Sequence, residues 1–363
     1  MLKLERRAER SRVLAVASPV LALGITVVIG VLLFAALGLD PRRGLEMFFY
    51  EPIKNTRALA ELSIKASPLL LIGLGLSICF RANVWNIGAE GQFILGTIGA
   101  SSVAMHATAD SSSSVVVPVL LAGTAAGMLW AGVTALLRDR FNANEILVSL
   151  MLVYVAEQVL SYLVQGPWKD PNGYNFPQTI TFLAQTRVPR LLAGSRANWG
   201  IVIALVSVVL AWLFVHKTHA GYRLEVSGLA PRAARYAGFS SRGALWTALL
   251  VSGGMSGLAG ALEVAGPVGQ LTTHVPLGYG FAAIIVAFVG RLEPIGVTLS
   301  SILMSMFYIG GELSQSRLGL PKAITGVFQG LLLFSLLSCD VFIDYRVRLT
   351  GWKRLPPPAT ERT

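Results

Sequence analysis

Long apolar runs alternate with short polar segments along most of this chain. Ten such runs can be read, and most have close to the roughly 20 residues that a helix needs to cross a bilayer. They lie at 13–38, 66–81, 87–107, 115–137, 146–164, 199–215, 243–265, 276–290, 294–311 and 322–338. A β-barrel would instead show alternating segments of about ten residues. We therefore expect an all-α integral membrane protein with about ten transmembrane helices.

A polar stretch with two glycines separates the second run from the third. It reads Phe80-Arg81-Ala82-Asn83-Val84-Trp85-Asn86-Ile87-Gly88-Ala89-Glu90-Gly91-Gln92. A charged side chain at the bilayer centre costs roughly 2.5–3.5 kcal/mol, and irregular backbone is tolerated there only against protein or a water-filled cavity. We therefore predict a broken-helix region near 82–92.

The polar side chains of this region have two interpretations. In the first, Asn86, Glu90 and Gln92 line a path for a polar solute, and Gly88 and Gly91 permit close approach of backbone or solute. In the second, the stretch is a short cytoplasmic turn whose Glu90 faces water. Spacing alone does not separate the two.

Composition agrees with membrane insertion. The chain has 363 residues, of which 54% are hydrophobic and 13% are charged, with a mean hydropathy of +0.63. Soluble proteins carry about 25% charged residues. The net charge of +11 reflects basic residues retained on the cytoplasmic side, so it does not indicate nucleic acid. Placing both termini in the cytoplasm puts 19 of the 30 basic residues on that side.

Three regions follow from this topology. Residues 1–12 form a basic cytoplasmic amino terminus, and the run at 13–38 is longer than the apolar core of about 7–15 residues in a signal peptide, so it is a retained span. Residues 13–339 form the polytopic transmembrane domain. Residues 340–363 form a flexible cytoplasmic tail. The proline-rich segment 165–198 is too polar to span and is predicted to be an extracytoplasmic loop on which an outside partner can land.

The basic segment 216–242 is predicted to lie in the cytoplasm and to contain a short helix. Pro231 suits a first helical turn and Gly238 suits a helix end, which leaves about two turns from which Arg232, Arg235 and Tyr236 project. Such a helix either docks a partner or is a feature that any loop can carry. His216 and His219 have no acidic or thiol residue to complete a metal site, so we expect them to be solvated.

Catalytic motifs are missing from the sequence. It contains no G-x-x-x-x-G-K-[ST] phosphate loop, H-E-x-x-H, G-x-S-x-G or C-x-x-C. Cys79 and Cys339 stand in apolar surroundings and are expected to be inert buried thiols. Glu90 and Glu145 both follow asparagine-containing turns on the same predicted side of the membrane. We expect no enzymatic activity, metal or cofactor in this chain.

A weak internal echo relates two parts of the sequence. Phe80 with Ile87-Gly88 and Phe288 with Ile295-Gly296 share an offset of 208 residues. The echo is either a trace of duplication, which is common in transporters, or a coincidence.

Four separated motifs resemble permease subunits of ABC importers. They are Asn86-Ile87-Gly88-Ala89-Glu90-Gly91-Gln92, the run from Asn144-Glu145 to Leu152, Pro231-Arg232-Ala233-Ala234-Arg235-Tyr236-Ala237-Gly238, and Gly278-Tyr279-Gly280-Phe281 followed by Val286 to Arg291. The resemblance runs from about residue 60 to 340. It is to the branch that serves branched-chain amino acids, ribose and simple sugars, and within it to nucleoside or simple-sugar permeases. Leu229-Ala230 and Glu293 depart from the family pattern.

The resemblance implies a set of partners. Such permeases pair with a second permease subunit, usually as a heterodimer, with cytoplasmic ATPase subunits that hold ATP and Mg²⁺, and with an extracytoplasmic binding protein, in the cell membrane. The segment from Gly228 to Gly238 maps onto the coupling helix that contacts the ATPase, with Pro231, Arg232, Arg235 and Tyr236 as contact or framing residues.

The resemblance also implies a path for a nucleoside or simple sugar. Its predicted lining is Asn86, Glu90, Gln92, Asn144 and Glu145, with Phe281 as a stacking partner. An ion-coupled secondary transporter of a small polar solute is the alternative function. The sequence leaves the particular nucleoside or sugar open, as it does the choice between a homodimer and a heterodimer.

Overall fold

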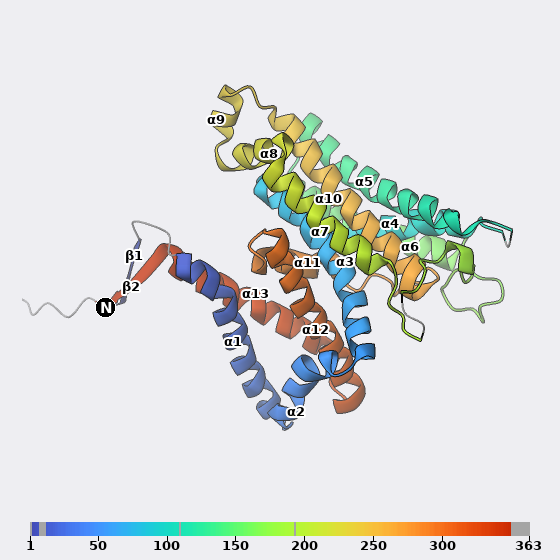
Figure 1. The fold of residues 1–363 in the computed structure, drawn as a ribbon, viewed down its shortest axis with the longest axis horizontal. Coiled ribbons are helices and arrows are strands. Elements are labelled where there is room, and N and C mark those ends of the chain that lie inside the picture. Colours follow the sequence, from blue (N-terminus) through green and yellow to red (C-terminus); the bar gives the residue numbers. More distant parts are fainter. Residues whose placement is uncertain (1, 7–11, 109, 192–193, 350–363) are drawn as a thin grey trace, which may run out of the picture. The chain divides into compact units, whose positions relative to one another are not determined.

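The computed structural model describes residues 2–6, 12–108, 110–191 and 194–349 (Figure 1). Its regular structure is helical, apart from one antiparallel pair of five-residue strands in the described part of the chain. Internal contacts divide the chain into two units, Met1–Leu45 with Gly326–Thr363, and Glu46–Thr325. The predicted all-α architecture is confirmed.

The smaller unit contains the two ends of the described chain. It comprises β1 (Leu2–Arg6), α1 (Arg12–Ala36), α2 (Pro41–Leu45), most of α13 (Ala323–Asp344) and β2 (Tyr345–Leu349). The ring centroids of Phe34 and Phe328 lie 5.7 Å apart, and Ser18 Oγ donates a hydrogen bond to Asp340 Oδ1 at 2.8 Å. The strand pair was not predicted. Residues 1 and 7–11 of the predicted basic terminus, and residues 350–363 of the predicted tail, lie outside the described residues.

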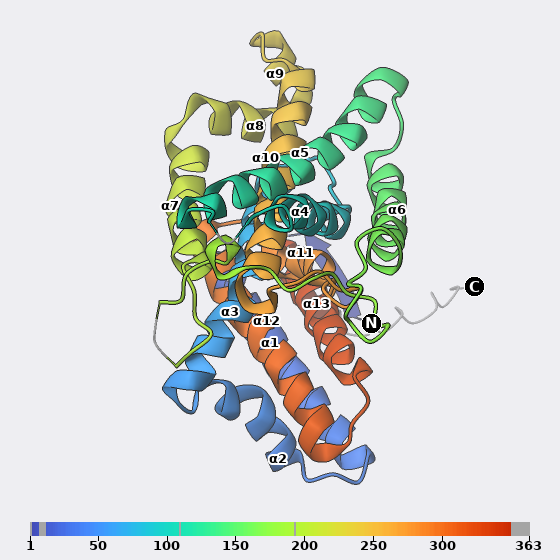
Figure 2. The same ribbon diagram turned by 90° about the vertical axis from the view of Figure 1, so that its right-hand side faces the viewer.

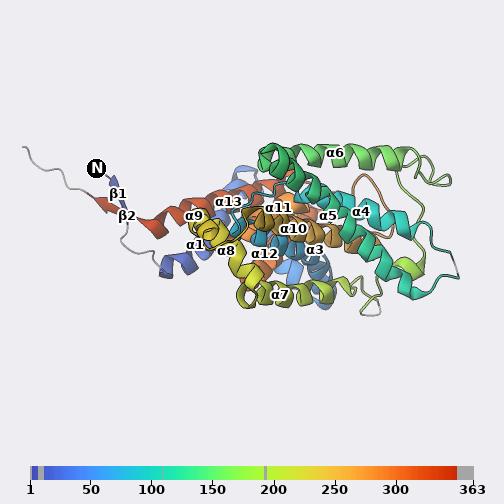
Figure 3. The ribbon, with the colours of Figure 1, turned by 90° about the horizontal axis from the view of Figure 1, so that it is seen from above.

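The larger unit is a helical bundle. Its helices are α3 (Thr56–Arg81), α4 (Ala89–Ala104), α5 (Val116–Phe141), α6 (Glu145–Gln165), α7 (Gly200–Lys217), α8 (His219–Leu229), α9 (Pro231–Tyr236), α10 (Ser241–Glu263), α11 (Tyr279–Val289) and α12 (Pro294–Leu318). The unit also contains two short π-helical segments, η1 (Glu46–Tyr50) and η5 (Val264–Val268), and three short 3-10 helices, η2 (Glu51–Ile53), η3 (Ser113–Val115) and η4 (Ala184–Thr186). Figures 2 and 3 show α6 and α7 on opposite sides of α3, α4 and α10.

Eight helices in the described residues are long and apolar enough to cross a membrane. They include α1, α3, α5, α6, α7, α10, α12 and α13. The prediction of about ten is therefore corrected. The two predicted spans at 87–107 and 276–290 correspond to α4, which has 16 residues, and α11, which has 11. Helix α4 is shorter than its predicted span at both ends, and α11 is shorter mainly at its start, where irregular backbone precedes it.

The second span was predicted to begin at residue 66, and this start was wrong. Helix α3 begins at Thr56, where Asn55 caps it by accepting a hydrogen bond from the Ala58 N–H at 2.8 Å. Its first turns carry Glu61 and Lys65, which lower the local hydropathy without ending the helix. Lys65 pairs with Glu312 of α12 at 2.8 Å.

The centre of the larger unit is built on close contact between glycine-bearing helices. A Cβ on Gly96 of α4 would lie 2.4 Å from the Gly257 carbonyl oxygen of α10, and a Cβ on Gly257 would lie 2.4 Å from the Gly123 carbonyl oxygen of α5. No real Cβ tolerates such distances, so these three helices approach to a separation that only glycine permits. Small residues at the contact permit this close packing of membrane helices.

Two glycines of α5 provide a matched test of this packing. A Cβ on Gly127 would lie 2.4 Å from the Gly253 carbonyl oxygen, whereas a Cβ on Gly132 would meet only Leu250 Cδ2 at 3.7 Å. We expect Gly127→Ala to destabilise the fold by about 1–3 kcal/mol, the usual cost of overpacking. Gly132→Ala should be neutral. Thermal unfolding of the two purified variants in detergent is the measurement, and equal midpoints would contradict the packing described here.

Candidate functional site

The break between α3 and α4 comprises residues 82–88. Asn83 has a left-handed backbone with φ of 53°, and its N–H donates to the Phe80 carbonyl at 3.0 Å. The N–H of Val84 reaches back to the Cys79 carbonyl at 3.0 Å. These bonds close the end of α3, as predicted for a broken helix in this region.

The polar side chains within and after the break bind one another. Asn86 and Gln92 exchange two amide hydrogen bonds, each 2.9 Å long. The Nδ2 of Asn86 also donates to Ser252 Oγ of α10 at 3.0 Å, and its Oδ1 accepts from the Gly88 N–H at 3.2 Å. Asn86 and Gln92 are at most 1% exposed. Their hydrogen-bonding capacity is largely satisfied by protein, as buried polar groups require.

Glu90 joins α4 to the start of α11. Its Oε1 accepts a hydrogen bond from the Gly278 N–H at 3.0 Å, and its Oε2 accepts one from the Gly280 N–H. A carboxylate at a helix amino terminus satisfies N–H groups that have no partner within the helix and complements the helix dipole. Since Glu90 is 1% exposed, the interpretation in which this side chain faces water is wrong for the described structure.

The two glycines at the start of α4 lie against α6. A Cβ on Gly88 would lie 2.8 Å from the Ser149 carbonyl oxygen, and a Cβ on Gly91 would lie 3.0 Å from Val153 Cα. The Ile87 N–H also donates to Ser149 Oγ at 3.2 Å. The prediction that Gly88 and Gly91 permit close approach of backbone is confirmed, and the backbone that approaches them is that of α6.

The remaining predicted path residues lie near this region but have other contacts. Asn144 caps α6 by accepting from the Ile146 N–H at 2.9 Å, and Glu145 pairs with Arg138 of α5 at 3.2 Å. Glu145 lies one helical turn before Ser149, the residue of α6 that binds the break. Phe281, in the first turn of α11, is 40% exposed. A solute-binding role for these residues stays a prediction.

Three aromatic side chains pack beside the break. The rings of Phe80 and Phe288 stack with centroids 5.1 Å apart, and Trp85 lies 5.3 Å from Phe80 and 6.1 Å from Phe288. Phe80 and Phe288 are the two phenylalanines of the internal echo. Two positions that correspond in the echo are therefore in contact with each other in the structure.

The predicted helix between Pro231 and Gly238 is present as α9. Gly238 has φ of 79°, the left-handed conformation that often follows a helix end. Ala234 is buried, while Arg232 and Arg235 are exposed and Tyr236 is 98% exposed. Helix α9 projects from one end of the larger unit (Figure 1). Helix α8, immediately before it, was not predicted.

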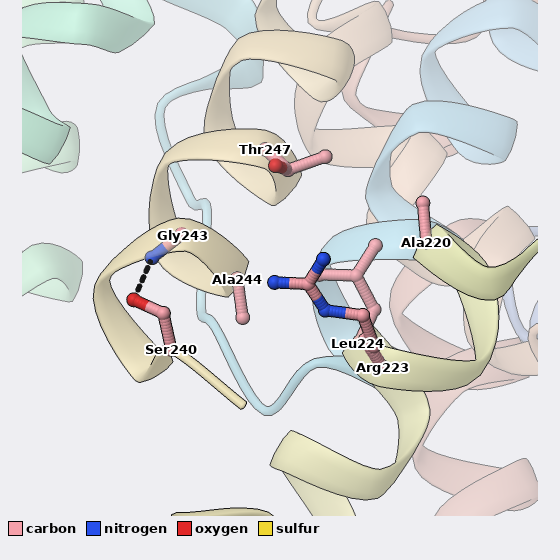
Figure 4. Close-up of a pocket in the computed structure, with 7 residues that line it drawn as sticks. All are labelled: Ala220, Arg223, Leu224, Ser240, Gly243, Ala244 and Thr247. Atoms are coloured by element: carbon pink, nitrogen blue, oxygen red, sulfur yellow. Dashed lines mark hydrogen bonds between the residues drawn. The ribbon is translucent and has the colours of Figure 1, made fainter. Parts of the chain in front are cut away.

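Helix α8 is anchored on one side and loosely packed on another. Leu224 is buried, and a Cβ on Gly221 would lie 2.2 Å from the Phe214 carbonyl oxygen of α7. Between α8 and the first turns of α10 lies a cavity of about 90 Å³. Figure 4 shows Arg223 extending from α8 toward α10 at this cavity. Its lining is Ala220, Arg223, Leu224, Ser240, Gly243, Ala244 and Thr247.

The long loop at 165–198 folds against the segment that follows α10. The N–H groups of Thr179, Phe182 and Val188 donate to the carbonyls of Leu271, Gly269 and Ala265 at 2.8–3.0 Å. A pocket of about 370 Å³ opens beside this contact, and three arginines line it together with uncharged residues. These arginines are Arg187, Arg190 and Arg196.

Several partners of the predicted residues carry no signal in the local sequence. Ser252 lies in an apolar, glycine-rich run, and a lone serine there gave no signal. Gly278 and Gly280 contribute backbone N–H groups, which no side-chain pattern marks. Their partner Glu90 lies 188 and 190 residues away in the sequence. Among the described residues, no group of three or more His, Cys, Asp or Glu side chains is placed to hold a metal ion.

Comparison with known proteins gives consistent matches. The family described as branched-chain amino acid transport system / permease component matches residues 58–337. The chain is 32% identical over 364 residues to the glucose ABC transporter permease protein TsgB13 of Haloferax volcanii, covering 97% of this chain and 95% of the relative. It is 27% identical over 325 residues to the guanosine ABC transporter permease protein NupP of Bacillus subtilis, covering 88% and 92%.

A second Haloferax volcanii protein, the putative glucose ABC transporter permease protein TsgC13, is 29% identical over 200 residues, which cover 54% of this chain and 59% of the relative. No solved structure matches the chain.

The fold defines a helical, multi-pass membrane protein with a broken helix among its central elements. The chain belongs to this family of ABC transporter permeases. The resemblance drawn from the four motifs is thereby confirmed. So is the expectation that the chain is not an enzyme, because the family is not catalytic.

The contacts of Glu90 lead to a stability prediction. Glu90→Ala removes the acceptor for two buried N–H groups, each of which costs about 1–3 kcal/mol when unsatisfied. We expect a clear fall in the thermal unfolding midpoint and faster hydrogen exchange at the amides of Gly278 and Gly280. Glu90→Gln retains one acceptor oxygen, so its unfolding midpoint should lie between those of Glu90→Ala and the unmodified protein.

Glu312→Ala is the control, since Glu312 is an exposed carboxylate paired with Lys65, and such pairs contribute at most about 1 kcal/mol. If Glu90→Ala lowers the midpoint no more than Glu312→Ala does, the bonds from Glu90 to α11 do not support the fold.

Proposed function

We propose that this chain is one permease subunit of an ABC importer for a nucleoside or a simple sugar. The names of the relatives support this substrate range, because TsgB13 is named for glucose and NupP for guanosine. Both solute classes carry several hydroxyl groups. The polar groups near the break are compatible with such solutes, but they do not choose between them.

The exposed face of α9 is the observation that carries the proposal. Its tyrosine is 98% exposed and stands beside two exposed arginines, and tyrosine and arginine are the residue types enriched where protein partners bind most strongly. In the proposed transporter this partner is a cytoplasmic ATPase subunit, which holds the ATP and Mg²⁺. The permease itself carries no cofactor. Gly228, Pro231 and Gly238 frame the contact, and Arg232, Arg235 and Tyr236 make it.

The orientation follows from this assignment. With α9 in the cytoplasm, the loop at 165–198 lies at the other end of α7 and faces outward. We propose that the short helices α4 and α11, together with the irregular segments beside them, also complete crossings, which puts both termini in the cytoplasm of a cell-membrane protein. An extracytoplasmic binding protein would then dock near the pocket that Arg187, Arg190 and Arg196 line. Carboxylates on the surface of the binding protein would complement the positive charge of these arginines. A second permease subunit completes the transporter. The presence of TsgB13 and TsgC13 in one organism supports a heterodimer.

The path residues take two proposed roles. Asn86, Glu90 and Gln92 hold the wall of the path in shape, because their polar atoms already bind Ser252, Gly278 and Gly280. They would reach a solute only when these bonds exchange during transport. Phe281, with its exposed ring, is the stacking partner, while Asn144 and Glu145 contribute polar groups at the start of α6.

Charge reversal on α9 tests the coupling. The double variant Arg232→Glu with Arg235→Glu should weaken binding of the ATPase subunit at least tenfold, which corresponds to about 1.4 kcal/mol. ATP-driven uptake in proteoliposomes should fall with it, while the variant permease keeps its unfolding midpoint. Co-purification with the ATPase and radiolabelled uptake are the measurements.

The control variant makes the same charge change elsewhere, through Arg57→Glu with Lys322→Glu, two exposed positions outside α9. Unchanged ATPase binding by the α9 variant would overturn the contact. Uptake by the purified permease alone, driven by a sodium or proton gradient, would overturn the importer and favour an ion-coupled secondary transporter.

A further inference from the structure

Arg81, the last residue of α3, is the centre of an ionic cluster. Its side chain is 12% exposed and makes three contacts with other elements. The Nε donates to the Leu292 carbonyl at 3.2 Å, one terminal nitrogen bonds to Glu293 Oε1, and the other lies 3.5 Å from Glu225 Oε1 of α8. A single guanidinium therefore links α3, α8 and the turn between α11 and α12.

The turn that Arg81 holds has an unusual backbone. Arg291 and Leu292 are consecutive non-glycine residues, both with φ of 58°. L-residues adopt this left-handed region rarely, so the turn depends on external contacts to persist. The Arg81 bond to the Leu292 carbonyl is one of these contacts. A second comes from α7, where His216 Nε2 lies 3.1 Å from Glu293 Oε2.

Helix α8 touches the same residue through its backbone. A Cβ on Gly228 would lie 2.1 Å from the Arg81 carbonyl oxygen and 3.0 Å from the Asn83 nitrogen, so α8 presses directly on the end of α3 and the beginning of the break. On its α10 side, α8 borders the cavity of about 90 Å³. Because the cavity leaves space on that side, α8 can move toward α10 more easily than toward Arg81.

We infer that Arg81 is the positioning residue through which a movement of α8 and α9 reaches the break and the turn between α11 and α12. The inference rests on the proposed function, because α9 must be the segment that the ATPase moves. Arg81 contacts the α8 backbone, the α8 carboxylate of Glu225 and the left-handed turn at once. Rotation of α8 changes these contacts together, which shifts α3 and α12 as one response.

The complete transporter, reconstituted with its second permease, ATPase and binding protein, provides the test. The readout is the number of solute molecules moved per ATP hydrolysed, which a merely structural residue would not change in an assembled complex. We expect Arg81→Gln to keep ATPase association and ATP hydrolysis but to lower this ratio at least tenfold. The charge-swapped pair Arg81→Glu with Glu293→Arg should recover part of the loss.

Arg317→Gln is the matched control. Arg317 lies in the last turn of α12 and pairs with Glu51 at 3.0 Å, so it is also an arginine near a helix end that binds a carboxylate of another element, and none of its described contacts is with α8. If the Arg81→Gln transporter moves as many solute molecules per ATP hydrolysed as the Arg317→Gln transporter does, the inference is overturned. If Arg81→Gln fails to assemble, Glu293→Gln replaces it, and an unchanged ratio in that variant overturns the inference equally.

Failure of the proposed function gives a different result. In that case the unmodified complex shows no ATP-dependent uptake or no ATPase association, whatever residue occupies position 81. A normal unmodified transporter with a normal Arg81→Gln variant refutes only the role of Arg81.

Discussion

The larger unit depends on satisfying the backbone where its helices break among apolar neighbours. Helix α11 begins in the middle of the unit, and its first N–H groups have no partner within the helix. Glu90 supplies the acceptor from α4, and the close contact at Gly280 leaves no room for any other residue type there. The Asn86–Gln92 amide pair serves the same purpose on the other side of the break. Glu90 therefore ties one interruption to the other, while Asn86 ties the break to α10 through Ser252, so each interruption has its polar groups bound by another element.

Hydropathy was sufficient to predict most of the helices and insufficient to predict their ends. The runs that became α5, α6 and α7 are bounded by clear polar turns, so their predicted limits differ from the structure by a few residues. Helix α3 extends ten residues earlier than predicted, because Glu61 and Lys65 are accommodated by partners on other elements. The strands β1 and β2 lie at opposite ends of the sequence, and a pairing over such a distance leaves no local pattern.

In the candidate site too, the polar residues could be predicted from the local sequence, whereas their distant partners could not. Isolated polar residues within apolar runs marked Asn86, Glu90 and Gln92 as important, and the structure gives each a defined set of partners. The identity of those partners was not accessible, because Ser252, Gly278 and Gly280 lie more than 160 residues away and two of them act through backbone N–H groups. Arg81 was visible only as a basic residue beside a turn. Its contacts with Glu225 and Glu293 arise from the fold, since α8 and the turn after α11 meet only when the bundle is assembled.

The length of α11 has a consequence for permeation. Eleven residues extend about 16 Å, roughly half of the 30 Å hydrocarbon layer of a bilayer. The chain before α11 is irregular from about residue 269 to Gly278, and polar backbone of this kind stabilises water at a depth that a continuous helix would keep dry. The dielectric barrier beside α11 is therefore thinner than the membrane itself. A polar molecule that passed beside α11 would therefore lose its hydration shell over a shorter distance than one that crossed the apolar layer alone.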